Sequence, residues 1–433
     1  MQSVRFKTNS LFNTLIIFFI VINLACTKSV LESSDSLSSQ RTFKNERTAF
    51  KNNLINNTIL KAFSYPLTDS TESEWQGAIW GMQLAQYRNS LIDSSIESAM
   101  SNLSSYSNSM QRSLLEIAYS MYQGVFIKDI ESKLNEIENE KVFAMAVEYL
   151  MQVQNVDKLI EHQLLMKSKF SSWNENPILY MLNNRMDEHF GNISYVTPPL
   201  KDLFKKNINP DYMTIFSFYR NNRDYIGQTI FRKKDGTFLR DSTGKLISVK
   251  QFARSVTNLP PYLTNGNTPQ GLYVIKEFDI SENVFIGPSK NIQTRLPFEV
   301  YLGEFLFDDK NNNSWTIEEY KNLLPETWKD YFPIYEAYYA GKAGRTEIIA
   351  HGTTINPEFY SKYSFYPYTP SLGCMTTKEL WSLETGERLE SDQQKLIDII
   401  ESLQTAFGYW IIIELDDKQE DVTINEIENL FSE

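Results

Sequence analysis

The spacing of apolar residues changes once along the chain, near residue 205, and this change limits the folds that are possible. Between about residues 46 and 205 apolar residues recur every three or four positions, as in EWQGAIWGMQLAQY and EKVFAMAVEYLMQVQ. That spacing places them on one face of a helix. From about residue 210 the apolar residues alternate with polar ones and are rich in Ile, Phe and Tyr, which is typical of strands. The sequence therefore predicts an α+β protein, with an all-helical domain followed by a β-rich domain.

The β-rich domain is expected over residues 210–416, with a C-terminal tail at 417–433. Strands are predicted at GLYVIKEF, FEVYLGEFLF, TEIIAHGT and YWIIIELDD, and the Asp-Gly pair at 235–236 marks a hairpin turn. The segment SDQQKLIDIIESLQTAF predicts a helix with Ser391 as its N-cap. Residues 308–342 are expected to form a helical insertion in this domain, and DVTINEIENLFSE a short helix in the tail.

The N-terminal 45 residues have the pattern of a targeting segment and a tether. A basic start, MQSVRFK, precedes a short apolar run, which predicts a signal peptide over residues 1–25. The run ends in NLAC, which resembles a bacterial lipoprotein cleavage site with Cys26 as the lipid-bearing residue. The alternative is an uncleaved anchor, or a plain signal with an incidental cysteine. Residues 26–45 are rich in serine and predict a flexible tether, so we expect a lipoprotein of the cell envelope that faces the periplasm and is attached to the membrane by its N-terminal lipid.

Composition and charge exclude one class of partner. The net charge is −12 and no long run of Lys and Arg occurs, so nucleic acid is not expected to bind. Asp309, Asn311 and Asn313 have the opening spacing of a calcium loop, but Ser314 replaces the turn glycine and Tyr320 stands where a bidentate Glu is needed. We therefore predict a polar turn at this place, and neither a metal nor another cofactor.

Cysteine and histidine are scarce, which makes their positions informative. There are two cysteines and three histidines. If Cys26 carries a lipid, Cys374 is the only remaining thiol and has no intrachain disulfide partner. Of the histidines, His162 and His189 lie in the helical half, where a surface or capping role is expected. His351 follows the apolar run EII at a predicted strand end.

A thiol becomes nucleophilic when a nearby imidazole takes its proton, so Cys374 and His351 form a candidate pair. The carbonyl of Gly352 would hold the ring of His351 by its other nitrogen. The backbone at Ser371, Leu372 and Gly373 would bind substrate or form an oxyanion hole, because Gly373 permits a close approach. The alternative is a buried, inert cysteine with a structural histidine.

These residues resemble a known family. HGT followed by SLGCM is similar to the catalytic motif of L,D-transpeptidases, and TPQGLYVI at 268–275 resembles the Thr-Pro-x-Gly start of a strand that precedes the motif in that family. The resemblance covers roughly residues 210–416 and not the helical half. It implies that Cys374 is the nucleophile, that His351 is its imidazole partner and that the Gly352 carbonyl orients the ring.

Two positions depart from the family pattern. Ser371 and Gly373 match it, but Leu372 stands where the family has a second histidine, and Thr376 where an arginine is common. The first change alters polarity beside the nucleophile, and the second weakens carboxylate recognition. The resemblance therefore supports the fold and the acyl chemistry more firmly than the exact reaction.

The reaction implied by the resemblance is acyl transfer on peptidoglycan stem peptides. The thiolate attacks the carbonyl at the L-centre of meso-diaminopimelate or an equivalent residue, D-Ala leaves, and the thioester passes to an amine of a neighbouring stem. Transfer to water would make the protein an L,D-carboxypeptidase or another murein hydrolase on the same fold. A third possibility is a non-catalytic lipoprotein that binds murein or protein through its helical half.

The loop between the two motif segments contains an aromatic run. It comprises Tyr363, Phe365, Tyr366 and Tyr368. These side chains would either close over the thioester as a lid or pack the loop against the sheet.

Overall fold

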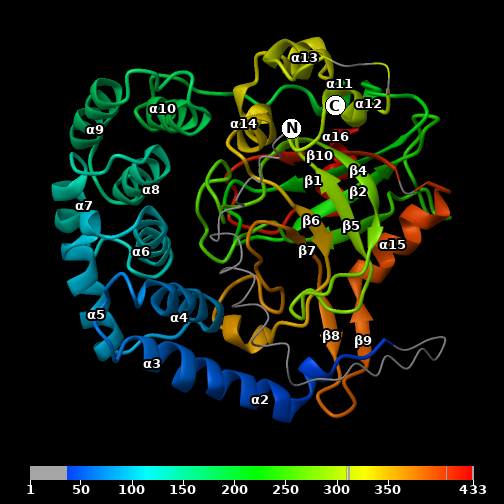
Figure 1. Ribbon diagram of the computed structural model, residues 1–433. Coiled ribbons are helices and arrows are strands. Elements are labelled where there is room, and N and C mark those ends of the chain that lie inside the picture. The colour runs from blue at the N-terminus through cyan, green and yellow to red at the C-terminus, as the bar shows by residue number, and fades with distance from the viewer. Residues whose placement is uncertain (1–36, 309, 311–312, 406, 432–433) are drawn as a thin grey trace, which may run out of the picture. The chain divides into compact units, whose positions relative to one another are not determined.

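The computed structural model describes residues 37–308, 310, 313–405 and 407–431. A helical N-terminal part and a large mixed sheet follow each other along the chain, which confirms the predicted combination of helices and sheet (Figure 1). The predicted signal peptide, most of the tether and Cys26 lie outside the described residues. The boundary between the two predicted domains stays a prediction.

Successive helices occupy the first part of the chain, coloured blue to green in Figure 1. Asparagine or serine side chains cap five of them and accept hydrogen bonds from the first-turn N–H groups, which explains where these helices begin. The elements are η1 (Gln40–Thr42), α2 (Lys44–Asn53), η2 (Leu54–Ile59), α3 (Leu60–Ala62), α4 (Glu72–Ala85), α5 (Ser90–Ser101), η3 (Leu103–Ser105), α6 (Asn108–Met121), α7 (Ile127–Lys133), α8 (Glu140–Met151), α9 (Val156–Lys169), α10 (Pro177–His189) and α11 (Leu200–Lys205).

The core of the helical part also includes residues from the second half of the chain. Leu259, Tyr262 and Leu263 are buried in the same cluster as the inner faces of α4, α6, α8 and α10. Tyr262 donates a hydrogen bond of 2.7 Å to Glu148 of α8, which is buried and also pairs with Arg185 of α10. The helices and the loop that precedes β4 (Gly271–Asp279) therefore pack as one interior.

The sheet has the strand order β3-β2-β1-β10-β4-β5-β6-β7. Only β1 with β10 and β6 with β7 are parallel pairs; the other neighbours are antiparallel. A separate antiparallel pair is formed by β8 and β9. The remaining strands are β1 (Met213–Tyr219), β2 (Gly227–Arg232), β3 (Ser248–Gln251), β5 (Asn291–Arg295), β6 (Ile349–His351), β7 (Met375–Thr376), β8 (Glu379–Trp381), β9 (Arg388–Ser391) and β10 (Gly408–Glu414).

Both faces of the central strands are covered. On one face the side chains of Ile215 and Ile412 pack with α15 (Asp392–Ser402). On the other face Phe216 and Ile411 pack with α11 and with α16 (Ile424–Leu430). Strands that are buried on both faces are apolar throughout, which explains the continuous apolar run in β10.

One predicted strand is wrong. FEVYLGEFLF forms the short helix α12 (Leu302–Leu306), which ends at Phe307 in a left-handed conformation with a φ of 55°. Leu302 and Phe305 are fully buried and lie three residues apart, so the apolar spacing fits a helical turn as well as a strand.

Other local predictions agree with the structure. Ser391 accepts a hydrogen bond from the Gln394 N–H at 2.8 Å and caps α15, as expected. The segment 308–342 contains α13 (Ile317–Asn322), η4 (Glu326–Trp328), η5 (Phe332–Tyr335) and α14 (Glu336–Lys342). Part of the segment compared with a calcium loop, including Asp309 and Asn311, lies outside the described residues.

Candidate functional site

The predicted nucleophile and base lie on neighbouring strands. β6 ends with His351, and β7 begins directly after Cys374. The two strands pair in parallel, with Ala350 opposite Met375 and His351 opposite Thr376. This register places Cys374 level with Ile349, two residues before His351, so the thiol and the imidazole come from neighbouring segments near opposite ends of the β6–β7 pair.

The Cys374 thiol is half-buried and is protonated at neutral pH. Its Sγ donates a weak hydrogen bond of 3.5 Å to the carbonyl of Glu347. Burial raises the pKa of Cys374 to about 11, although the Ile349 N–H and the charge of Arg345 act in the opposite direction. The resting thiol is therefore not an activated thiolate.

The His351 imidazole is buried and neutral. Its Nδ1 lies 2.5 Å from the Gly352 carbonyl oxygen, which is the contact that the sequence predicts. An Nδ1–H that donates to this carbonyl leaves the lone pair on Nε2. Burial lowers the pKa of His351 to about 4. Among the described residues, no hydrogen bond joins this ring to the thiol of Cys374.

The turn before Cys374 is held by its own side chains. Ser371 Oγ donates to the Cys374 carbonyl at 2.8 Å and accepts from the Gly373 N–H at 3.0 Å. This N–H is therefore already used and does not serve as an oxyanion donor in this conformation. Gly373 has a φ of 118°, which only glycine adopts readily. Leu372 is half exposed at the tip of the turn.

Arg345 is a residue of the site that the sequence did not indicate. Its buried guanidinium donates to the backbone carbonyls of Pro261, Asn267 and Gly266. A Cβ on Gly373 would collide with it. The guanidinium is the cation whose charge lowers the pKa of Cys374. Nothing in GKAGRTEII marks this arginine, because its role depends on a loop about eighty residues earlier in the chain.

Glu379 is a second residue that the sequence did not indicate. Its buried carboxylate accepts hydrogen bonds from Ser391 Oγ at 2.7 Å and from the Thr353 N–H at 3.0 Å. A Cβ on Gly352 would collide with the same carboxylate. Glu379 therefore fixes the backbone that follows His351, and glycine is required at 352 for this close approach.

The aromatic run packs the loop against the sheet. Phe365 and Tyr368 are buried and contact Phe252. The centroid of the Phe252 ring lies 4.8 Å from that of Phe365 and 6.0 Å from that of Tyr368. Tyr363 stacks on Phe365, while Tyr366 is largely exposed. These contacts favour the packing interpretation over a lid.

Two further expectations concern histidine and metal sites. His162 is buried, with Nε2 2.9 Å from Gln154 Oε1, so the expected surface role is wrong; the helix packs it inward. His189 is exposed at the end of α10.

In the parts of the chain that the structure covers, no group of three or more His, Cys, Asp or Glu side chains is placed to hold a metal ion. No helix among the same residues is long and apolar enough to cross a membrane.

A partly buried acidic group lies where α14 begins. Glu336 accepts a hydrogen bond from the Gln270 N–H at 3.0 Å. Glu414 pairs with Arg223 and accepts from the Gln270 side chain at 3.3 Å. Burial, with the charge of Glu414 adding to it, raises the pKa of Glu336 to about 8.

Stability is therefore expected to depend on the protonation of Glu336. Between the ordinary carboxyl value of 4.5 and about 8 the folded chain holds a proton that the unfolded chain releases. This contribution is fully present below pH 4.5 and is lost as the pH rises through 8. Glu336→Gln should therefore stabilise the protein at pH 9 by about 1–3 kcal/mol and change little at pH 5.5. Urea unfolding at both pH values measures this. Glu318→Gln on exposed α13 is the control. If Glu336→Gln lowers the free energy of unfolding equally at both pH values, the expectation is contradicted.

A scan of protein-family models, a search of curated proteins and a search of solved structures each gave no match for this chain.

Proposed function

We propose that this chain is a cysteine acyltransferase of the L,D-transpeptidase type that acts on murein stem peptides. The observation that carries the proposal is the parallel pairing of β6 with β7, because it brings Cys374, directly before β7, within two register positions of His351 on β6. The Gly352 carbonyl contact of the imidazole supports it as well. In this proposal residues 210–416 are the catalytic domain, 308–342 are an insertion in it, and 46–205 form a helical domain.

The first step is proton transfer from the thiol to His351. The Cys374 side chain turns away from the Glu347 carbonyl, and Nε2 of His351 takes the proton as Sγ attacks the substrate carbonyl carbon. The charge of Arg345 stabilises the negative charge on sulfur. Since the resting thiol is protonated, His351 acts as a general base during the attack.

The second step completes the transfer. The carbon–nitrogen bond to D-Ala breaks, and the leaving amine takes the proton from His351. An amine of a neighbouring stem then attacks the thioester, its proton passes through His351 to sulfur, and a cross-link forms. Attack by water in place of the amine gives L,D-carboxypeptidase activity. A lipid on Cys26 would hold the enzyme at the periplasmic side of the envelope.

Mass spectrometry tests this function directly. Purified full-length protein is incubated with a disaccharide tetrapeptide, and the masses of protein and products are read. An adduct on Cys374 with release of D-Ala supports the proposal. Dimeric products indicate a transpeptidase, and tripeptide products alone indicate a carboxypeptidase. Unchanged substrate and unmodified protein would contradict both.

A non-catalytic binding protein is the second candidate. Two observations favour it: the raised pKa of Cys374, and a thiol that contacts Glu347 and not His351. Such a protein would bind murein without consuming it, so co-sedimentation with purified sacculi and unchanged muropeptide masses would identify it.

The pH profile follows from the two shifted groups. A base with a pKa of about 4 and a thiol with a pKa of about 11 are both in the required state between these values. We therefore expect kcat/KM for the tetrapeptide to rise as the pH passes through about 4 and to stay flat up to about 10. A bell-shaped profile centred near neutrality would contradict it and would indicate a thiolate–imidazolium pair. Iodoacetamide labelling of the resting thiol should still be increasing with pH above 9.

A further inference from the structure

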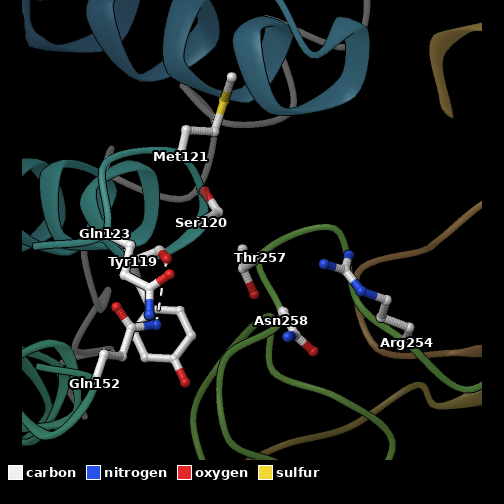
Figure 2. Close-up of a pocket in the computed structure, with 8 residues that line it drawn as sticks. All are labelled: Tyr119, Ser120, Met121, Gln123, Gln152, Arg254, Thr257 and Asn258. Carbon is white, nitrogen blue, oxygen red and sulfur yellow. Dashed lines mark hydrogen bonds between the residues drawn. The ribbon is translucent and has the colours of Figure 1, made fainter. Parts of the chain in front are cut away.

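A polar cavity lies between the helices and the loop that leads to β4. Its volume is about 390 Å³, which falls within the usual range for small-ligand sites, about 300–1,000 Å³. One wall is formed by the C-terminal ends of α6 and α8, with Tyr119 and Gln152. The opposite wall is the loop with Arg254, Thr257 and Asn258, as Figure 2 shows. The cavity contains neither Cys374 nor His351.

Several polar atoms at this cavity lack a protein partner in the part of the chain described by the structure. The Oε1 of Gln152 is buried and unpaired, while its Nε2 donates to the Tyr119 carbonyl at 3.4 Å. The Oδ1 of Asn258 accepts from Asn267 at 2.9 Å, which leaves the two hydrogens of Nδ2 unused. Arg254 donates to Asp224 through Nε and to the Ser255 carbonyl through Nη1, so its Nη2 has no hydrogen-bond partner among the described residues.

These atoms define the chemistry of a ligand. The lining contains one guanidinium, which pairs with Asp224 through Nε, and no carboxylate. A guanidinium nitrogen and an amide nitrogen on one wall are donors that suit a carboxylate. The unpaired Gln152 oxygen on the facing wall is an acceptor that suits an N–H group. A carboxylate with an amide N–H close by is what the C-terminal residue of a peptide presents.

We propose that this cavity binds the free C-terminal carboxylate of a short peptide. The proposal goes beyond the acyl transfer at Cys374 and stands on the cavity alone. The cavity wall is also joined to the turn that carries the thiol: the Ser371 N–H donates to the Arg254 carbonyl at 3.3 Å, and the Val256 N–H donates to the Ser371 carbonyl at 2.8 Å. A peptide end bound here therefore contacts a segment that is hydrogen-bonded to the turn before Cys374.

Calorimetric titration of the full chain with matched probes tests the site. The probes are N-acetyl-dialanine, in the L,L and D,D forms, and the corresponding C-terminal amides. We expect at least one acid to bind, and its amide to bind at least about tenfold more weakly, because the amide lacks the charge that the guanidinium recognises. Equal binding of acid and amide, or no binding of either at about 10 mM, would overturn the proposal.

Asn258→Asp is the variant that locates the binding. Aspartate keeps the oxygen that accepts from Asn267 and tolerates the φ of 56° at this position, but it puts a negative charge in the cavity. The acid should bind at least about tenfold more weakly to it. Asn174→Asp makes the same charge change at an exposed turn and should bind normally. If Asn258→Asp does not fold, Gln123→Glu at the exposed rim serves the same purpose, and unchanged affinity in the folded variant would exclude this cavity as the site.

Discussion

Replacing Cys374 with alanine is expected to abolish acyl transfer to and from stem peptides. The variant should form no adduct and should lose turnover by a factor of at least about 10³, since no other described side chain at the β6–β7 edge carries a thiol. The thiol is half-buried and makes one weak hydrogen bond as a donor, to the Glu347 carbonyl, so its removal should change stability little. Product masses from a disaccharide tetrapeptide are the measurement.

His351→Ala completes this experiment. Loss of the general base should reduce kcat by about 10²–10⁴-fold while the Cys374 thiol remains available to alkylating reagents. His189→Ala, at an exposed helix end, is the matched control and should retain full activity. If Cys374→Ala or His351→Ala turns over substrate at the wild-type rate, the acyltransferase proposal fails. The non-catalytic candidate would then be preferred.

The helical half could be predicted from the sequence because its signals are local. Apolar residues at three- and four-residue spacing give α4 and α8 directly. The strand β10 was also predictable, because its five consecutive residues from Tyr409 to Ile413 all have a strong strand preference. FEVYLGEFLF was not, since ten residues with mixed apolar spacing fit both periods and tertiary packing of Leu302 and Phe305 decided between them.

One contact of the candidate site was predictable, but its electrostatics and its buried charged residues were not. The contact of His351 with the Gly352 carbonyl follows from adjacent residues and was expected. The pKa values of Cys374 and His351 depend on burial, which arises from parts of the fold remote in sequence. Arg345 and Glu379 act through loops that only the folded chain brings to the site, so no motif marks them.

The prediction with the largest effect on stability concerns the ion pair between Glu148 and Arg185. Glu148 is almost fully buried, and its carboxylate accepts from Arg185 Nε at 2.7 Å and from the Tyr262 hydroxyl at 2.7 Å. Arg185→Met keeps the apolar stem but leaves the carboxylate without its cation. Removing one partner of a buried pair costs about 3–5 kcal/mol. Because the arginine side chain is 36% exposed, we expect water to offset part of that cost and the loss to be about 2–4 kcal/mol.

A second substitution separates the charge from the packing. Glu148→Gln in the Arg185→Met background removes the unpaired charge and keeps an oxygen for the Tyr262 hydroxyl. The double variant should therefore regain more than half of the lost stability in urea unfolding. If it is as unstable as Arg185→Met, the loss comes from packing and not from an uncompensated charge.

The same pair also tests whether the helical half is an independent domain. Glu148 and Arg185 belong to α8 and α10, whereas Tyr262 belongs to the loop before β4, and all three meet in one buried cluster. If this shared interior couples the two halves, Arg185→Met should accelerate amide hydrogen exchange in β10 as well as in α8. Faster exchange in the helices alone would mean that the helical part opens by itself, and the predicted division near residue 205 would then describe two separately stable domains.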